Sequence, residues 1–199
     1  VYGTLESLKI SLGSGDDTFT VASTHSGTTE LNTNGGGDTV NVRTIAAATT
    51  VNTGADADTV NVGSLAPSTG GNVNGIGAVL TINGEGGSDT LNVDDTGDTL
   101  ANTGNLTATE LTGLGMANGV TYHGLENLEV SLGSGGDTLA VEGTMSRVNY
   151  RTVTVLNTGA GNDDVTINLH KGIDGFFALN TGEDADTVNG SNSTLPLIV

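Results

Sequence analysis

The chain has 199 residues, with 32 glycines, no cysteine, no tryptophan and only 3% aromatic residues. These counts exclude a disulfide framework and disfavour a compact core built on large aromatic side chains. Five Lys and Arg residues against 23 Asp and Glu residues give a formal charge of −18. We therefore expect neither nucleic acid nor anionic lipid as a partner, because both need clustered cations.

Apolar residues alternate with polar ones in short, regularly spaced runs from one end of the chain to the other. None of these runs approaches the ~20 apolar residues that span a bilayer, so we expect no membrane insertion. The chain opens with Val1 and has no signal-like apolar region. We expect it to be a processed product or a segment of a longer protein.

Seven segments align without gaps on a Gly-x-Gly-x-Asp-Thr-apolar pattern. In chain order they are residues 13–19, 34–40, 54–60, 85–91, 133–139, 159–165 and 182–188. Asp stands at the fifth place of all seven: Asp17, Asp38, Asp58, Asp89, Asp137, Asp163 and Asp186. The successive spacings are 21, 20, 31, 48, 26 and 23 residues. The spacing of 48 leaves room for two coils, and that of 31 for one coil with a loop.

Each segment joins two predicted strands through a tight turn. β-Branched residues at period two lead in, and Gly and Asp supply the positive φ and the side-chain-to-backbone bonds of a corner. The strand that follows places Val60 and Val62 on one face and Asn61 on the other. No segment has convincing helical periodicity, and residues 106–119 are the least strand-like and are expected to form a loop. The pattern predicts an all-β fold, an elongated parallel β-solenoid with about 20–24 residues per coil.

A longer period is superimposed on the short one. Residues 5–21 and 125–141 share 11 of 17 positions at an offset of 120, and the offset reaches 128 at Asn52 and Asn180. Loop insertions would produce this drift. The predicted organisation is one solenoid segment over 1–199, with a long unit at 1–120 and a partial second copy at 121–199. We expect the array to continue beyond both ends.

The Gly-x-Gly-x-Asp core resembles the repeats-in-toxin (RTX) nonapeptide, a family whose fold is a parallel β-roll with Ca²⁺ between stacked turns. The resemblance implies calcium as a cofactor and the seven Asp residues of the pattern as its ligands, with Asp16, Asp56 and Asp184 as further ligands. The chain is also similar to the very long "LGSGDDTFTV…NTGAGDDTVNV" repeats of giant secreted proteins from bacteria and some algae. That similarity implies an extracellular or cell-surface location.

The pattern departs from the RTX nonapeptide in two ways. There is usually one turn per coil instead of two, and Asp56 and Asp184 stand where the family has glycine. Asn34 and Glu85 replace the first glycine in two other copies. The alternative to calcium is that each Asp caps its own turn by accepting backbone N–H bonds.

The sequence has three other notable features. Asn precedes the turn at positions 32, 52, 83, 157 and 180, which predicts a stacked amide ladder. Thr follows the Asp in six of the seven copies, a pattern of good strand formers that also occurs in ice-binding faces. Arg147, Tyr150 and Arg151 lie close together in an insertion, which we interpret as a decorated loop rather than a catalytic centre.

The leading hypothesis is a structural repeat module of an extracellular filament, fibre or surface adhesin stalk, assembling end to end or continuing in a longer chain. No catalytic residues are expected, so the chain is not predicted to be an enzyme. The alternative is a calcium-dependent module that binds glycans or a surface. A polysaccharide lyase or epimerase and an ice-binding protein rank below these. Asn105, Asn189 and Asn192 open glycosylation sequons, so a glycoprotein is also considered.

Overall fold

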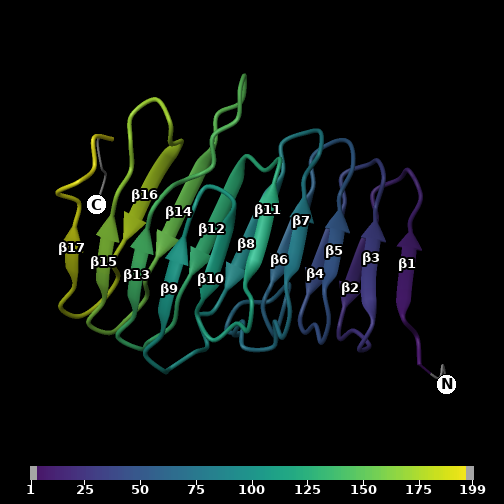
Figure 1. The fold of residues 1–199 in the computed structure, drawn as a ribbon, viewed down its shortest axis with the longest axis horizontal. Coiled ribbons are helices and arrows are strands. Elements are labelled where there is room, and N and C mark those ends of the chain that lie inside the picture. The colour runs from purple at the N-terminus through teal and green to yellow at the C-terminus, as the bar shows by residue number, and fades with distance from the viewer. Residues whose placement is uncertain (1–3, 196–199) are drawn as a thin grey trace.

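The computed structural model describes residues 4–195, which form two stacked β-sheets and contain no helix. The first sheet has ten strands, in the spatial order β1 (Ser7–Ser11), β3 (Thr28–Asn32), β5 (Thr49–Asn52), β7 (Leu80–Asn83), β11 (Val120–His123), β10 (Glu110–Gly113), β9 (Thr103–Leu106), β13 (Thr138–Val141), β15 (Asp164–Ile167) and β17 (Thr187–Asn189). The second has seven, in the order β16 (Phe176–Asn180), β14 (Val153–Asn157), β12 (Asn127–Ser131), β8 (Thr90–Asp94), β6 (Thr59–Val62), β4 (Thr39–Val42) and β2 (Thr18–Val21). The predicted all-β parallel solenoid is confirmed, and the molecule is an elongated rod (Figure 1).

The repeat keeps equivalent residues in register from coil to coil. Leu31 pairs with Val51 and Val51 with Ile82 in the first sheet, and all three are fully buried. In the second sheet the paired residues Val40, Val60 and Leu91 are buried in the same way. The period of two therefore fills the space between the sheets with stacked Val, Leu and Ile side chains. As predicted, Val60 and Val62 lie in this core and Asn61 lies on the outer face.

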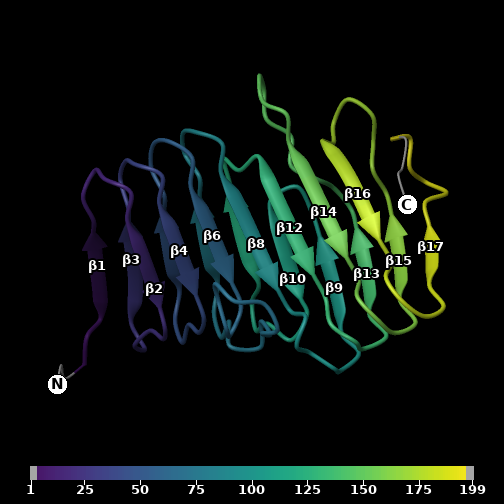
Figure 2. The same cartoon turned by 180° about the vertical axis from the view of Figure 1, so that it is seen from behind.

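The solenoid changes phase in its middle. In the first half, the strand that leads into each Gly-Asp turn belongs to the ten-stranded sheet and the strand that leaves it to the seven-stranded sheet. From β12 onward the assignment is reversed, because β12 leads into a turn yet pairs with β8 in the seven-stranded sheet. Figures 1 and 2 show that the two sheets run in opposite directions. The Gly-Asp turns therefore lie at the upper edge of Figure 1 in the first half and at the lower edge in the second.

An antiparallel meander produces this change of phase. After β8 the chain enters the ten-stranded sheet at β9, returns through β10 and reaches β11, which pairs with β7. The prediction of a loop over residues 106–119 was therefore wrong for residues 110–113, which form β10, whereas residues 107–109 and 114–119 lie outside the strands. Gly113 and Gly119 adopt positive φ values of 81° and 84°, and these conformations allow the reversal between β10 and β11. In the turn between β9 and β10, the hydroxyl of Thr107 accepts the N–H of Glu110 at 3.0 Å. The 48-residue spacing between turns holds this meander and β12.

Candidate functional site

The Asp residues of the first half form a column at the upper edge. The backbone N–H of Asp17 donates to Oδ1 of Asp38 at 2.7 Å, and the N–H of Asp38 donates to Oδ1 of Asp58 at 2.7 Å. The N–H of Asp58 donates to Oδ1 of Asp89 at 3.0 Å. The N–H of Asp89 donates to Oε2 of Glu126 at 2.8 Å, which ends the column. Each carboxylate thus caps the turn of the preceding coil and not its own turn.

The second half builds an equivalent column at the lower edge. The N–H of Asn102 donates to Oδ1 of Asp137 at 2.8 Å. The N–H of Asp137 donates to Asp163 at 2.7 Å, and that of Asp163 to Asp186 at 3.0 Å. Stacking identical coils would place all these Asp residues in a single column at one edge, but the meander moves the later turns to the opposite edge. Sequence reasoning also missed Glu126 and Asn102, since neither belongs to a Gly-Asp turn.

The inner Asp residues of the two columns are at most 4% exposed, whereas Asp17 and Asp186 at the ends are partly exposed. Burial raises the pKa of Asp58, Asp89 and Asp137, in the case of Asp89 to about 7, and the N–H bond from the preceding coil opposes this rise. In several coils, one carboxylate oxygen of the column Asp has no hydrogen-bond partner within the described residues. The Oδ2 atoms without a hydrogen-bond partner are those of Asp38, Asp58, Asp89 and Asp163. A buried unpaired carboxylate oxygen is costly, so a proton or a cation would stabilise these sites.

The three additional Asp residues bond glycine N–H groups of neighbouring coils. Oδ1 of Asp16 accepts from Gly37 at 2.9 Å, and Oδ2 of Asp56 accepts from Gly36 at 3.3 Å. Oδ2 of Asp184 likewise accepts from the neighbouring Gly161 at 3.1 Å. Asp56 and Asp184 both have a φ of 79°, a conformation that Asp tolerates better than most side chains. At these two positions, where the RTX nonapeptide has glycine, the Asp side chain adds a bond between coils.

These residues give calcium a partial ligand set. Ca²⁺ takes six to eight oxygen ligands, whereas Asp38, Asp58 and Asp89 of the first column each offer one buried carboxylate oxygen that has no hydrogen-bond partner. Within residues 4–195, no three His, Cys, Asp or Glu side chains gather closely enough to hold a metal ion. Backbone carbonyls would have to supply the other ligands. The calcium prediction remains a prediction, and the columns have a structural role without it.

Arg147 closes the end of the first column. Its guanidinium forms a salt bridge with Glu126 and donates to the carbonyl oxygens of Gly124 and Glu85, both at 2.7 Å. It also lies 4.2 Å from the centre of the Tyr150 ring. Arg147 belongs to the loop between β13 and β14, so this loop ties the second half of the solenoid to the first.

The predicted cluster of Arg147, Tyr150 and Arg151 does line one hollow of about 370 Å³. The guanidinium of Arg147 is engaged by the column end, and that of Arg151 lies 5.4 Å from the centre of the Phe176 ring. None of the column Asp residues lines this hollow. Asp174 also lines this hollow, and the interpretation of the cluster as a decorated loop stays a prediction.

Amide ladders run along both sheets. Asn83 donates to Asn52 and Asn52 to Asn32, each at 2.7 Å, as predicted for these three positions. Asn157 and Asn180 are paired on the seven-stranded sheet instead, so the predicted single ladder does not extend to them. A second ladder on that sheet was missed: Asn92 donates to Asn61 at 2.9 Å and Asn61 to Asn41 at 3.0 Å. The signal for it was the TVNV sequence that follows two turns.

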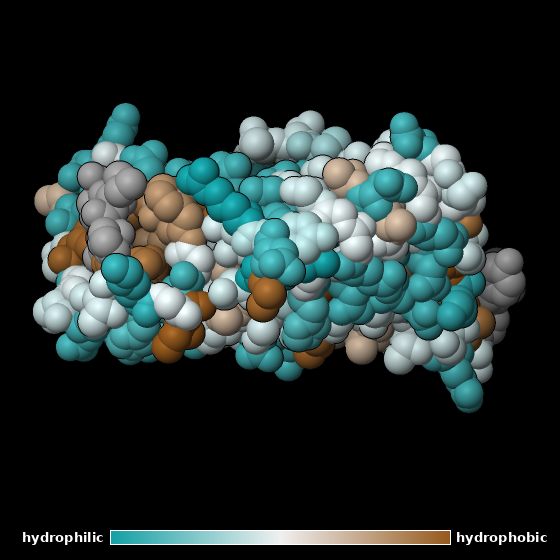
Figure 3. Space-filling view, turned by 90° about the horizontal axis from the view of Figure 1, so that it is seen from above, coloured by the Kyte–Doolittle hydropathy of each residue, from teal (hydrophilic) through white to brown (hydrophobic). Residues whose placement is uncertain are grey.

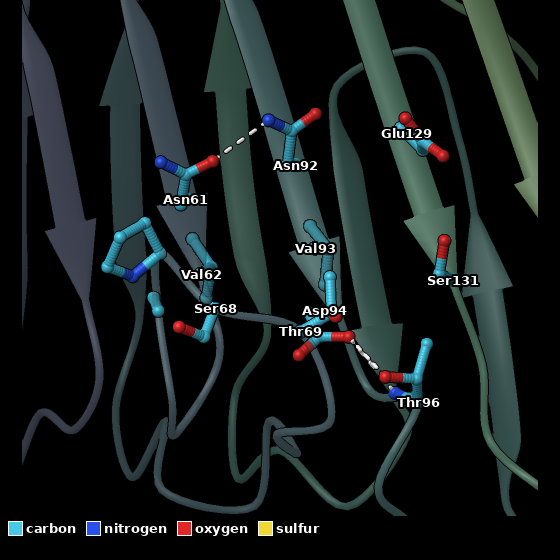
Figure 4. A pocket seen from close by; sticks show the side chains of 12 residues that line it. Asn61, Val62, Ser68, Thr69, Asn92, Val93, Asp94, Thr96, Glu129 and Ser131 are labelled. Carbon is cyan, nitrogen blue, oxygen red and sulfur yellow. Dashed lines mark hydrogen bonds between the residues drawn. The ribbon is translucent and has the colours of Figure 1, made fainter.

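A groove of about 240 Å³ lies against the outer face of the seven-stranded sheet. Figure 4 shows Asn61 and Asn92 on one side, Glu129 and Ser131 on the next strand, and Ser68 and Thr69 from the long loop between β6 and β7. Asp94 is held by Thr96 at 2.6 Å and by the N–H of Gly71 at 2.8 Å. The lining contains no Lys, Arg or His side chain. It offers amide, hydroxyl and carboxylate groups that suit a hydroxyl-rich ligand.

The predicted sequons are divided between strands and a loop. Asn105 lies in β9 and is exposed, Asn189 ends β17, and Asn192 lies in the exposed segment after it. The Thr residues after the turns are also divided by the phase change. Thr18, Thr39, Thr59 and Thr90 form one row on the seven-stranded sheet, whereas Thr138 and Thr187 lie on the other sheet with Asp164 between them.

Comparison of the chain with protein-family models, curated protein sequences and solved structures found no match. The function must therefore be inferred from the geometry of the rod itself.

Proposed function

We propose that the chain is a structural repeat module of an extracellular filament, fibre or surface stalk. The observation that carries this proposal is the pair of hydrogen-bonded carboxylate columns, which link turn to turn along both halves of the rod. Bonds between coils resist separation along the rod axis, which is the direction in which a stalk is loaded. The amide ladders on the outer faces add further bonds of the same kind.

The ends of the rod support assembly into longer structures. β1 and β2 at one end, and β17 and β16 at the other, each pair with a strand on one side only. Half-buried apolar side chains, Ile10, Leu12 and Phe19 among them, pack at the first of these ends. Unpaired strand edges recruit further strands, either from the same chain or from another copy. Association through these edges would be head to tail.

Electron microscopy of the purified chain tests this proposal. Rods of constant width that join end to end, and lengthen with protein concentration, are the expected result. A population of single short rods at every concentration would contradict end-to-end assembly. A chain that loses its β circular dichroism signal under mild load or heating would contradict the stalk role.

Calcium binding at the turns, as in RTX repeats, is a second part of the proposal. The buried Oδ2 atoms without a partner favour it, because a cation would compensate their charge. If calcium orders the array, adding a chelator should lower the melting temperature by many degrees, and adding Ca²⁺ should restore it. Equal melting with and without excess chelator would overturn this part and leave the columns as the source of stability.

The groove beside β6 and β8 favours a glycan-binding function as the second candidate. Its amide and carboxylate groups lie in one line on neighbouring strands, where they can bond successive sugar hydroxyls. Binding of neutral oligosaccharides that is weakened by Glu129→Ala would support this candidate. Equal binding by the variant would remove it. The extracellular location belongs to the same proposal.

A further inference from the structure

The strongest unexplained surface feature is a patch formed by two loops at the upper edge of the second half. We define this loop patch as residues 143–152 and 168–176. The two loops touch, because the N–H of Thr144 donates to Oδ1 of Asp174 at 2.7 Å. Both are longer than their counterparts in the first half, which span residues 22–27 and 43–48. The rod core does not require this additional length.

The loop patch concentrates cations in a strongly acidic chain. It holds Arg147, Arg151 and Lys171, three of the five Lys and Arg residues of the whole chain, against a single acid, Asp174. Its formal charge is therefore +2, whereas the chain carries −18. Arg147 is paired with Glu126, and Glu142 at the border of the patch accepts from Asn168, so Arg151 and Lys171 are the cations available to a partner. Arg151 and Lys171 are exposed and form no salt bridge within residues 4–195.

The same patch also concentrates exposed apolar side chains. Four of the seven large hydrophobic residues that are exposed in the described chain lie in it: Val148 at 85%, Ile173 at 67%, Tyr150 at 46% and Phe176 at 39%. Tyr and Arg are the residues that most often dominate binding energy at protein interfaces. Exposed apolar side chains rimmed by charge mark a contact surface.

The other half of the same edge has the opposite character. The turns 12–17, 33–38, 53–58 and 84–89 contain no Lys or Arg. Four acids reach their surface, namely Asp16, Asp17, Asp56 and Glu85. Figure 3 looks down on this edge and shows apolar brown atoms gathered mainly at the end that carries the C-terminal half, with teal and white atoms over most of the other end. Figure 1 shows that the loops of the patch also project further than the turns.

We propose that two copies of the chain pair side by side through this upper edge, antiparallel to each other. A two-fold axis would place the loop patch of each copy on the acidic turns of the other, so that one contact is made twice. In this arrangement the projecting, positively charged loop patch of one copy would face the shorter, negatively charged turns of the other. At physiological ionic strength the Debye length is about 8 Å, so the repulsion between the distant parts of the rods is screened while the close charge pairs persist. This pairing is lateral and goes beyond the end-to-end assembly proposed above.

Charge reversal tests the pairing. The loop-patch variant Arg151→Glu/Lys171→Glu changes the charge of the patch from +2 to −2. The turn variant Asp16→Lys/Glu85→Lys/Ser88→Lys changes the surface charge of the turns from −4 to +1. Sedimentation velocity should show dimers for the native chain, and a dissociation constant raised at least about tenfold for each variant alone. Mixing the two variants should restore dimers, because both contacts of the mixed pair are again between opposite charges.

The control is Lys9→Glu, which reverses a cation on the other face of the rod and should leave the dimer unchanged. Circular dichroism melting of every variant checks that the fold is kept, and Ser14→Lys/Ser88→Lys replaces the turn variant if that one unfolds. Small-angle scattering should give the dimer the length of one rod and twice its cross-section.

Several results would overturn the proposal. A native chain that stays monomeric, a dimer that both variants leave intact, or a mixture of variants that stays monomeric would each do so. So would a dimer twice as long as one rod, which would support end-to-end assembly alone. A monomeric native chain that binds an acidic polysaccharide through Arg151 and Lys171 would assign the patch to that ligand instead.

Discussion

Replacing one carboxylate in the middle of the first column gives the sharpest test of what the columns do. Asp58 accepts the N–H of Asp38 at 2.7 Å, and both residues are 2% exposed. Asp58→Ala leaves that N–H buried with no acceptor. Losing a hydrogen bond to a charged group costs about 1.5–3 kcal/mol. Removing a carboxylate whose pKa is raised by burial returns part of this cost, so we expect a net loss of about 1–2 kcal/mol.

Asp58→Asn separates the hydrogen bond from the charge. The amide oxygen keeps the acceptor for Asp38, while the amide nitrogen takes the place of an Oδ2 atom that has no partner. We expect the unfolding free energy of this variant to lie within about 1 kcal/mol of that of the native chain, and above that of the alanine variant. Urea denaturation followed by circular dichroism at neutral pH measures both, with and without chelator.

Asp164→Ala is the matched control. It removes one exposed carboxylate beside the second column, and surface changes of this kind shift stability by about 0.5 kcal/mol or less. If Asp58→Asn destabilises the chain as much as Asp58→Ala does, the negative charge is what the column needs. The hydrogen-bonding account would then be refuted, and a bound cation would take its place.

Three further changes test other parts of the fold. Arg147→Ala leaves Glu126 buried without its counter-ion and should lower the free energy of urea unfolding by about 3 kcal/mol. Adding Glu126→Gln should recover a large part of this loss. An unchanged unfolding free energy in the single variant would contradict the role of Arg147 at the column end. Burial raises the pKa of Asp95 from 3.8 to about 7, so the folded state favours the protonated form, and stability present at pH 4 should fall by at most about 4 kcal/mol as the pH rises through 7. Asp95→Asn should flatten this pH dependence, and an unchanged slope would show that other groups cause it. Gly54→Ala should strongly destabilise the stacked turns, because the φ of Gly54 is +95° and a Cβ would overlap the carbonyl oxygen of Asn34 in the neighbouring turn. Gly35 has open space around it, so Gly35→Ala should melt close to the native chain. Equal melting temperatures of the two variants would refute the stacking of the turns.

The parts of this fold that repeat were predictable from the sequence. Apolar residues at period two follow each turn, as Val60 and Val62 do, and every copy has an Asp at the position of Asp58. The strands, the core and the location of the acids in the turns therefore followed from local patterns. The hydrogen-bond donor that each Asp carboxylate binds could not be predicted from the sequence. An Asp can cap its own turn or that of a neighbouring coil with the same local sequence, and only the stacking distance between coils decides between them.

The change of phase could not be predicted because its cause occurs once. Residues 95–119 have no second copy in this chain, so no comparison of repeats could show that β10 lies antiparallel in the sheet. The strands of the meander, β9 and β10, are short and contain Gly and Thr, so their alternation of apolar and polar residues is weak. The later turns follow the same Gly-Asp pattern as the earlier ones, although the meander has moved them to the other edge.

A pair of engineered cysteines measures that change of phase most directly, since the native chain has none. Asn92 and Glu129 are paired on β8 and β12, and neighbouring strands are about 4.8 Å apart, within the range that a disulfide spans. Asn92→Cys/Glu129→Cys should therefore form an intramolecular disulfide on mild oxidation, while Thr81→Cys/Glu129→Cys should stay reduced. In a solenoid without the change of phase, Glu129 would lie on the same sheet as Thr81. Cross-linking of the second pair and not the first would contradict the two-edged arrangement of the carboxylate columns.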